Sequence, residues 1–119
     1  RLSATEFLAQ LSHVFKSSAI KHSALGPKSI HKVAVLGGSG AFAIENAIEQ
    51  SADAYVSADF KYHDFFKADS GFLLADIGHY ESERFTKNAI AQKLREKFPN
   101  FAVTLSELNT NPVKYYTYG

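Results

Sequence analysis

Hydrophobic residues near the start of the chain recur at the spacing of an amphipathic helix. The apolar positions lie three or four residues apart: Phe7, Leu8, Leu11, Val14 and Phe15. This spacing predicts a helix over residues 4–16 with one buried face. Ser3 and Glu6 precede the stripe in the S-x-x-E form of a capping box, which indicates that the helix begins directly after Ser3.

Farther along, the apolar pattern changes to short runs that predict β-strands. Four such runs are found, at residues 32–36, 54–56, 72–75 and 101–105. Helical segments are predicted between them, at residues 41–50, 63–69 and 80–97, while residues 17–30 predict a loop. The long last helix should bury Phe85, Ala89, Ile90, Leu94 and Phe98, and Pro99 should stop it.

The alternation of strands and helices predicts the fold class. Nearly continuous apolar strands are typical of sheets that are covered on both faces. We therefore expect one α/β domain over residues 1–119, with a mostly parallel or mixed sheet of about four to five strands and helices on both faces.

His79 and Glu83 are the strongest candidates for metal ligands. They follow the apolar run at residues 71–78 and lie four apart at the start of a predicted helix, so they share one helix face. An imidazole and a carboxylate in this arrangement can close on one divalent ion. Two ligands are too few for a complete site. The alternative is a surface histidine beside a glutamate that complements the helix dipole.

Polar residues concentrate directly after each predicted strand. The four clusters are Gly37–Gly40, residues 57–64, residues 76–83, and Glu107 with Asn109 and Asn111. If the strands are parallel, their carboxyl ends share one edge of the sheet, where open α/β folds bind ligands. The joint pattern is stronger evidence than any one cluster.

The glycine-rich segment supports a second hypothesis. Gly38, Ser39 and Gly40 lie between a predicted strand and a predicted helix, where bare amides can bind an anion. Gly38-x-Gly40-x-x-Ala43 also fits the dinucleotide fingerprint, with Asp59 about 20 residues farther on at the position of the ribose-binding acid. The plainer alternative is a tight turn that needs a positive φ.

Composition limits the kind of protein and the kind of site. Net charge is +1 without a basic block, and no apolar run is long enough for a bilayer, so we expect neither a nucleic-acid nor a membrane partner. Cysteine is absent, so a metal would need nitrogen and oxygen ligands, and a cytoplasmic location fits. The chain begins with Arg1 and lacks methionine, so we expect it to be a piece of a longer protein.

Four ordered segments resemble the Nif-three-like dinuclear metal centre proteins, also labelled GTP cyclohydrolase I type two homologues. The segments are residues 32–40, 58–64, 74–83 and 106–115. The resemblance implies the carboxyl-terminal domain of a toroidal homohexamer, with two divalent ions in each full-length subunit. His79 and Glu83 match two of the family's ligands, and the remaining ligands would come from an amino-terminal domain. The ions could be zinc, iron, manganese or magnesium, and this piece alone should be metal-poor.

Three functions remain open on the sequence. The first is a metal-dependent hydrolase-like protein, in which His63, Lys61 or Glu107 could act as acid, base or anion contact. The second is a nucleotide- or dinucleotide-binding module that uses Gly37–Gly40. The third is a non-enzymatic scaffold or regulatory protein that is stabilised by its metals.

Overall fold

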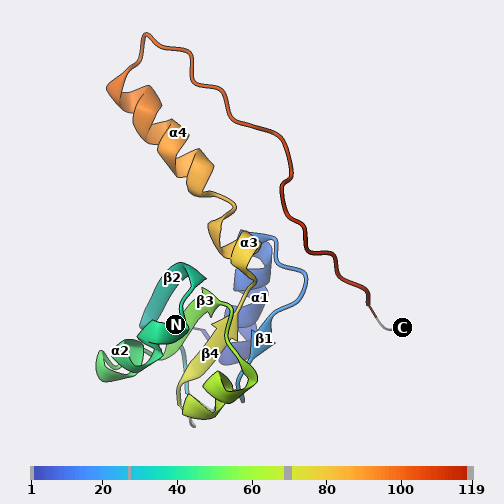
Figure 1. Ribbon diagram of the computed structural model, residues 1–119. Coiled ribbons are helices and arrows are strands. Elements are labelled where there is room, and N and C mark those ends of the chain that lie inside the picture. Colours follow the sequence, from blue (N-terminus) through green and yellow to red (C-terminus); the bar gives the residue numbers. More distant parts are fainter. Residues whose placement is uncertain (1, 27, 69–70, 118–119) are drawn as a thin grey trace. The chain divides into compact units, whose positions relative to one another are not determined.

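The computed structural model describes residues 2–26, 28–68 and 71–117 (Figure 1). It divides into two compact units, one that ends at Arg84 and one that begins at Phe85. Pro27, in the predicted loop, and residue 69, at the end of a predicted helical turn, lie outside the described residues. The first unit holds all four strands of the sheet.

The first helix, α1 (Ala4–Phe15), begins where the capping box predicts. Ser3 Oγ accepts a hydrogen bond from the Glu6 amide at 3.2 Å, and the Ser3 amide donates to Glu6 Oε1 at 3.1 Å. Two otherwise unpaired amides of the first turn are thereby satisfied, which fixes the start of the helix.

The sheet is mixed, and its order is β1-β4-β3-β2. Strands β2 (Val33–Ser39), β3 (Ala54–Ala58) and β4 (Leu73–Asp76) are parallel, whereas β1 (Lys21–His22) pairs antiparallel with β4. The predicted α/β class is confirmed. The prediction that residues 17–30 form only a loop is wrong, because Lys21 and His22 add an edge strand beside Asp76 and Ala75.

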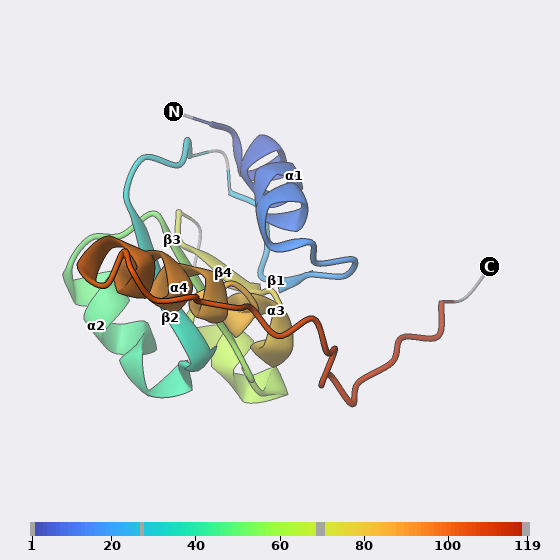
Figure 2. The same ribbon diagram turned by 90° about the horizontal axis from the view of Figure 1, so that it is seen from above.

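Two apolar clusters hold the sheet between helices, as Figure 2 shows with α1 on one side and α2 on the other. Ala54, Val56, Leu73 and Ala75 pack toward α1, and Tyr55 and Leu74 pack toward α2 (Ile44–Glu49). Successive strand residues alternate between the faces, which is the period of two expected for an extended chain. Two short 3₁₀ helices also belong to this unit, η1 (Ala41–Ala43) and η2 (Tyr62–Lys67).

The predicted long helix is two helices, α3 (His79–Glu83) and α4 (Thr86–Lys97). Arg84 ends the first unit, where its guanidinium donates to the carbonyl of Lys16 at 3.1 Å and stacks over the Tyr80 ring at 5.1 Å. The end of α3 is therefore anchored to the end of α1 through Arg84. Helical backbone hydrogen bonds begin again at Phe85, whose carbonyl accepts a hydrogen bond from the Ala89 amide.

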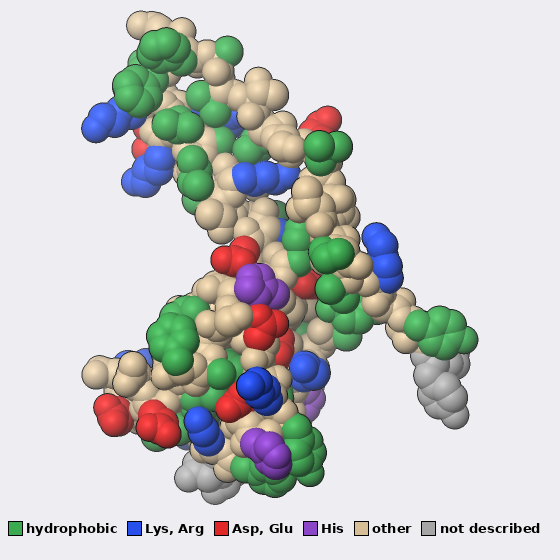
Figure 3. All heavy atoms as spheres, in the orientation of Figure 1, with side chains coloured by type: hydrophobic (Ala, Val, Ile, Leu, Met, Phe, Trp, Pro, Cys, Tyr) green, Lys and Arg blue, Asp and Glu red, His purple; other side chains and the backbone are tan. Residues whose placement is uncertain are grey.

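The predicted strand at residues 101–105 is wrong: residues 102–117 form neither helix nor strand. Side chains of α4 form hydrogen bonds with backbone carbonyls of this segment. Arg95 donates to the Val103 carbonyl at 2.9 Å, and Lys87 donates to the Ser106 carbonyl. The expected burial along the predicted long helix is also wrong, because all five of its named apolar residues are exposed: Phe85, Ala89, Ile90, Leu94 and Phe98. The buried residue of α4 is Ala91. Figure 3 shows apolar side chains at the surface of α4 and of the segment after it.

Candidate functional site

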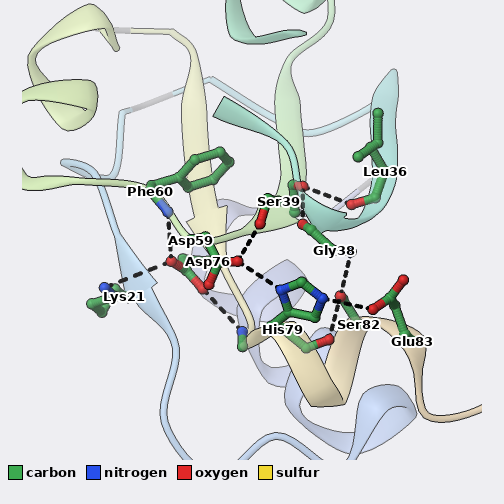
Figure 4. A network of polar contacts seen from close by, with 12 residues as sticks. Lys21, Leu36, Gly38, Ser39, Asp59, Phe60, Asp76, His79, Ser82 and Glu83 are labelled. Carbon is green, nitrogen blue, oxygen red and sulfur yellow. Dashed lines mark hydrogen bonds and ion pairs between the residues drawn. The ribbon is translucent and has the colours of Figure 1, made fainter. Parts of the chain in front are cut away.

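The carboxyl ends of the parallel strands bring three of the predicted polar clusters together. Ser39 ends β2, Asp59 follows β3, and Asp76 ends β4 two residues before Gly78, which leads into α3. Figure 4 shows Ser39, Asp59 and Asp76 near His79 at the start of α3, with Asp59 in contact with its ring. The fourth predicted cluster follows residues 101–105 and belongs to the other unit.

His79 lies at the centre of the site, with one carboxylate on each ring nitrogen. Its Nδ1 lies 2.6 Å from Asp59 Oδ2, and its Nε2 lies 2.8 Å from Glu83 Oε1. The three side chains are about half exposed, at 51%, 48% and 50% for His79, Asp59 and Glu83. The helical spacing therefore brings His79 and Glu83 into contact at the surface.

These contacts change the ionisation of two side chains. The hydrogen bond from the Ser39 hydroxyl, followed by the one from His79, lowers the pKa of Asp59 below its ordinary value. The hydrogen bond to Asp59 raises the pKa of His79, and the charge of Glu83 adds to this effect. Both shifts favour an ionised Asp59 carboxylate beside a protonated His79 ring.

Glycines let β2 approach α3 closely at this point. A Cβ on Gly38 would lie 3.3 Å from Glu83 Oε2 and 3.4 Å from His79 Nε2, and its φ of +81° also favours glycine. The Gly38 amide donates to Ser82 Oγ at 2.8 Å, and the Ser82 hydroxyl donates to the His79 carbonyl at 2.8 Å. Ser82 thereby ties the end of β2 to the first turn of α3.

Buried polar residues hold the strand ends in place beneath His79. Asp76 is 5% exposed and accepts hydrogen bonds from the amides of Phe60 at 3.1 Å and Gly78 at 3.0 Å. Ser57 donates to the carbonyls of Leu36 at 2.6 Å and Gly38 at 3.0 Å. The sequence analysis included Asp76 and Ser57 in the polar clusters after the strands. It gave no sign that their side chains form hydrogen bonds between neighbouring segments.

The other predicted site residues lie elsewhere. Lys61 and His63 are exposed at the start of η2, where the His63 ring contacts the rings of Tyr62 and Phe66 at centroid distances of 5.3 and 6.2 Å. Glu107 is exposed and belongs to the second unit. Asp59, which the sequence suggested as a ribose-binding acid, is instead the residue that contacts His79.

The site offers two metal donors that converge, rather than three. Within the described ranges, no group of three or more His, Asp or Glu side chains is arranged to hold a metal ion. Asp59 and Glu83 occupy opposite nitrogens of one imidazole, so they cannot reach the same ion. His79 Nε2 and Glu83 Oε1 are the pair that faces a common point, and nitrogen and oxygen donors suit several divalent ions.

Comparison with known proteins identifies the family. The family model described as Duf34/NIF3 (NGG1p interacting factor 3) matches residues 1–112. The chain belongs to the Duf34/NIF3 family. The resemblance noted in the sequence is thereby confirmed.

Curated relatives of this Duf34/NIF3 chain carry the name GTP cyclohydrolase 1 type 2 homolog. The Campylobacter jejuni relative is 36% identical over 92 residues, which cover 76% of this chain and 36% of the relative. The Staphylococcus aureus relative is 31% identical over 115 residues, which cover 92% of this chain and 31% of the relative. The Duf34/NIF3 chain thus spans about a third of the length of these relatives.

Solved structures share the fold. A Staphylococcus aureus protein superposes with a TM-score of 0.80 at 27% identity, covering 97% of this chain and 39% of that one. A Bacillus cereus protein related to NIF3 gives a TM-score of 0.77 at 25% identity, covering 97% of this chain and 33% of that one. In the part of the Duf34/NIF3 chain that the structure describes, no helix has the length and apolar character needed to cross a membrane.

Proposed function

We propose that this chain supplies His79 and Glu83 as ligands to a divalent metal centre in a hydrolase-like protein. The observation that carries the proposal is the 2.8 Å separation of His79 Nε2 and Glu83 Oε1 on one exposed face of α3. Two ligands at about 2.1 Å from one ion lie about 3.0–3.4 Å apart in octahedral or tetrahedral geometry. A small outward movement of Glu83 would therefore admit an ion between them.

The remaining ligands must come from outside the described residues. Because the chain spans about a third of the length of its relatives, we propose that those ligands belong to an amino-terminal domain of the full-length protein. We propose that the full-length protein is a cytoplasmic homohexamer with two divalent ions in each subunit. Zinc, iron, manganese and magnesium all accept imidazole or carboxylate donors, and this chain alone should bind each of them weakly.

Metal-assisted hydrolysis is the chemistry that such a site supports best. A divalent ion bound there would supply Lewis acidity and activate water near neutral pH. Glu83 would hold one side of the site, and His79 would contribute its Nε2 lone pair. Lys61 and His63 remain candidates for contact with a substrate, because both are exposed on the segment that follows Asp59.

The nucleotide-binding alternative is less well supported by the geometry. The Gly38 amide donates to Ser82, and the Gly40 amide donates to the Ala58 carbonyl at 3.2 Å, so neither is directed toward an anion. Asp59 already accepts hydrogen bonds from Ser39 and His79 rather than facing a ribose. In addition, β2 is an edge strand, not the central strand that carries the fingerprint in dinucleotide-binding folds.

Elemental analysis of the full-length protein tests the metal proposal. We expect about two divalent ions per subunit in the unaltered protein and a loss of one or both in His79→Ala and in Glu83→Ala. Both side chains lie outside the two apolar clusters, so the fold should survive each substitution.

Two exposed residues of the same types serve as controls. His13→Ala changes a histidine on α1, and Glu49→Ala changes a glutamate on α2. Both should leave the metal content unchanged. Equal metal content in His79→Ala, Glu83→Ala and the unaltered protein would contradict the proposal. Assembly that is preserved after the metal is stripped, with no activity on phosphoester or cyclic substrates, would favour the scaffold alternative.

A further inference from the structure

Asp59 binds the ring nitrogen of His79 that faces away from Glu83. Asp59 Oδ2 lies 2.6 Å from His79 Nδ1, and the same oxygen accepts a hydrogen bond from the Ser39 hydroxyl. Ser39 ends β2, Asp59 follows β3 and His79 begins α3, so three separate segments meet at one carboxylate oxygen (Figure 4). Asp59 is thus fixed from two sides.

The backbone at Asp59 shows how much this position is constrained. Its φ is +59°, in the left-handed region that few residues other than glycine adopt. Aspartate and asparagine tolerate this region better than other residues that have a side chain. At Asp59 the chain therefore combines a left-handed backbone with an acidic side chain that contacts His79. Glycine would fit the backbone but would lack the carboxylate.

The two carboxylates compete for the single proton of a neutral imidazole. If the proton is on Nδ1, it is donated to Asp59 and leaves the Nε2 lone pair free to bind a metal ion. If the proton is on Nε2, it is donated to Glu83 and blocks the ligating nitrogen. The shorter contact, 2.6 Å against 2.8 Å, is on the side of Asp59, where Ser39 also holds the acceptor in place.

We infer that Asp59 is a positioning residue that holds His79 in its Nδ1–H tautomer and so presents Nε2 to a divalent cation beside Glu83. The inference rests on the proposed function. Histidines that bind metals commonly donate their second ring N–H to a carboxylate, and loss of such a partner typically weakens metal binding about 10- to 100-fold. In this arrangement the Gly37–Gly40 segment does not bind an anion. Its role is to place Ser39, which orients Asp59.

Asp59→Asn is the decisive substitution, because asparagine keeps the size of the side chain and tolerates the left-handed backbone. The neutral amide is a weaker acceptor than the Glu83 carboxylate, so the proton should move to Nε2. ¹⁵N NMR of the imidazoles distinguishes a nitrogen that carries a proton from one that does not. His79→Gln assigns the His79 signals by difference. At a pH well above the pKa of His79, where the ring is neutral, we expect the Nδ1–H form in the unaltered chain and mainly the Nε2–H form in Asp59→Asn.

A Zn²⁺ titration of the full-length protein with a competing chelator gives the second readout. Asp59→Asn should bind Zn²⁺ about 10- to 100-fold more weakly. Glu45→Gln, which removes one negative charge from an exposed position on α2, should bind as the unaltered protein does. An unchanged tautomer, or a Zn²⁺ affinity within twofold of the unaltered protein, would overturn the inference. If His79→Ala lost zinc while Asp59→Asn kept it, the inference would fail but the proposed function would stand.

Discussion

Asp53 is a buried carboxylate that joins the segment before β2 to the start of β3. Its side chain is 8% exposed and lies 2.7 Å from Lys28 Nζ. It also accepts hydrogen bonds from the backbone amides of His31 and Lys32, each at 2.9 Å. The hydrogen bond from Lys28, with those of the two amides, lowers the pKa of Asp53 from 3.8 to about 2.

This shift sets the size and the pH range of the expected effect. The change in the pKa of Asp53 from 3.8 to about 2, at about 1.4 kcal/mol for each tenfold change in the acid constant, corresponds to roughly 2 kcal/mol of stability. Because Lys28 is 55% exposed, solvent screens part of this interaction, and about 1–2 kcal/mol is the expected contribution. Folding favours the ionised form, so the contribution is complete well above pH 3.8 and is lost as the pH falls through about 2.

Asp53→Asn should therefore destabilise the protein by about 1–2 kcal/mol at pH 7, measured by urea unfolding. The difference from the unaltered protein should shrink steadily as the pH falls from 5 toward 2, because the unaltered protein loses the same interaction. Glu49→Gln, on the exposed face of α2, controls for the loss of one charge and should change the stability by less than about 0.5 kcal/mol. A destabilisation by Asp53→Asn that is the same at pH 3 and pH 7 would refute the electrostatic explanation.

Two further predictions concern the edge of the sheet. Gly40→Ala would place a Cβ 2.0 Å from Ser57 Oγ, and we expect a loss of about 1–3 kcal/mol in urea unfolding. Gly37→Ala, where the nearest heavy atom would lie 3.3 Å away, should lose less, and equal losses would contradict the packing argument. Asp59→Asn should lower the pKa of His79 toward its ordinary value, so the ring should lose its proton at a lower pH in an NMR titration of the metal-free chain. An unchanged or higher pKa would contradict the assigned contact.

The sequence predicted those parts of the fold that depend on local patterns. The strands β3 and β4 are short apolar runs whose alternate residues face two different layers of helix, which is why both were found. The contact between His79 and Glu83 follows from helical spacing alone, so it could be placed without knowledge of the tertiary structure. The capping box of α1 is local for the same reason.

Features that depend on distant partners could not be predicted. Lys21 and His22 form a strand only because β4 offers a free edge, and two residues carry no periodic signal. Residues 101–105 have a strand-like composition, but the described segment joins no sheet. Side chains of α4 instead donate hydrogen bonds to the Val103 and Ser106 carbonyls. The contact of Asp59 with His79 depends on a left-handed residue in a loop, which no hydrophobic pattern encodes.

Anomalous diffraction from zinc-loaded crystals of the full-length protein would test the metal site most directly. We expect an anomalous peak at about 2.0–2.2 Å from both His79 Nε2 and a Glu83 carboxylate oxygen, with Asp59 still bound to Nδ1. Zinc bound elsewhere, with His79 Nε2 still hydrogen-bonded to Glu83, would contradict the assignment of these two residues as ligands.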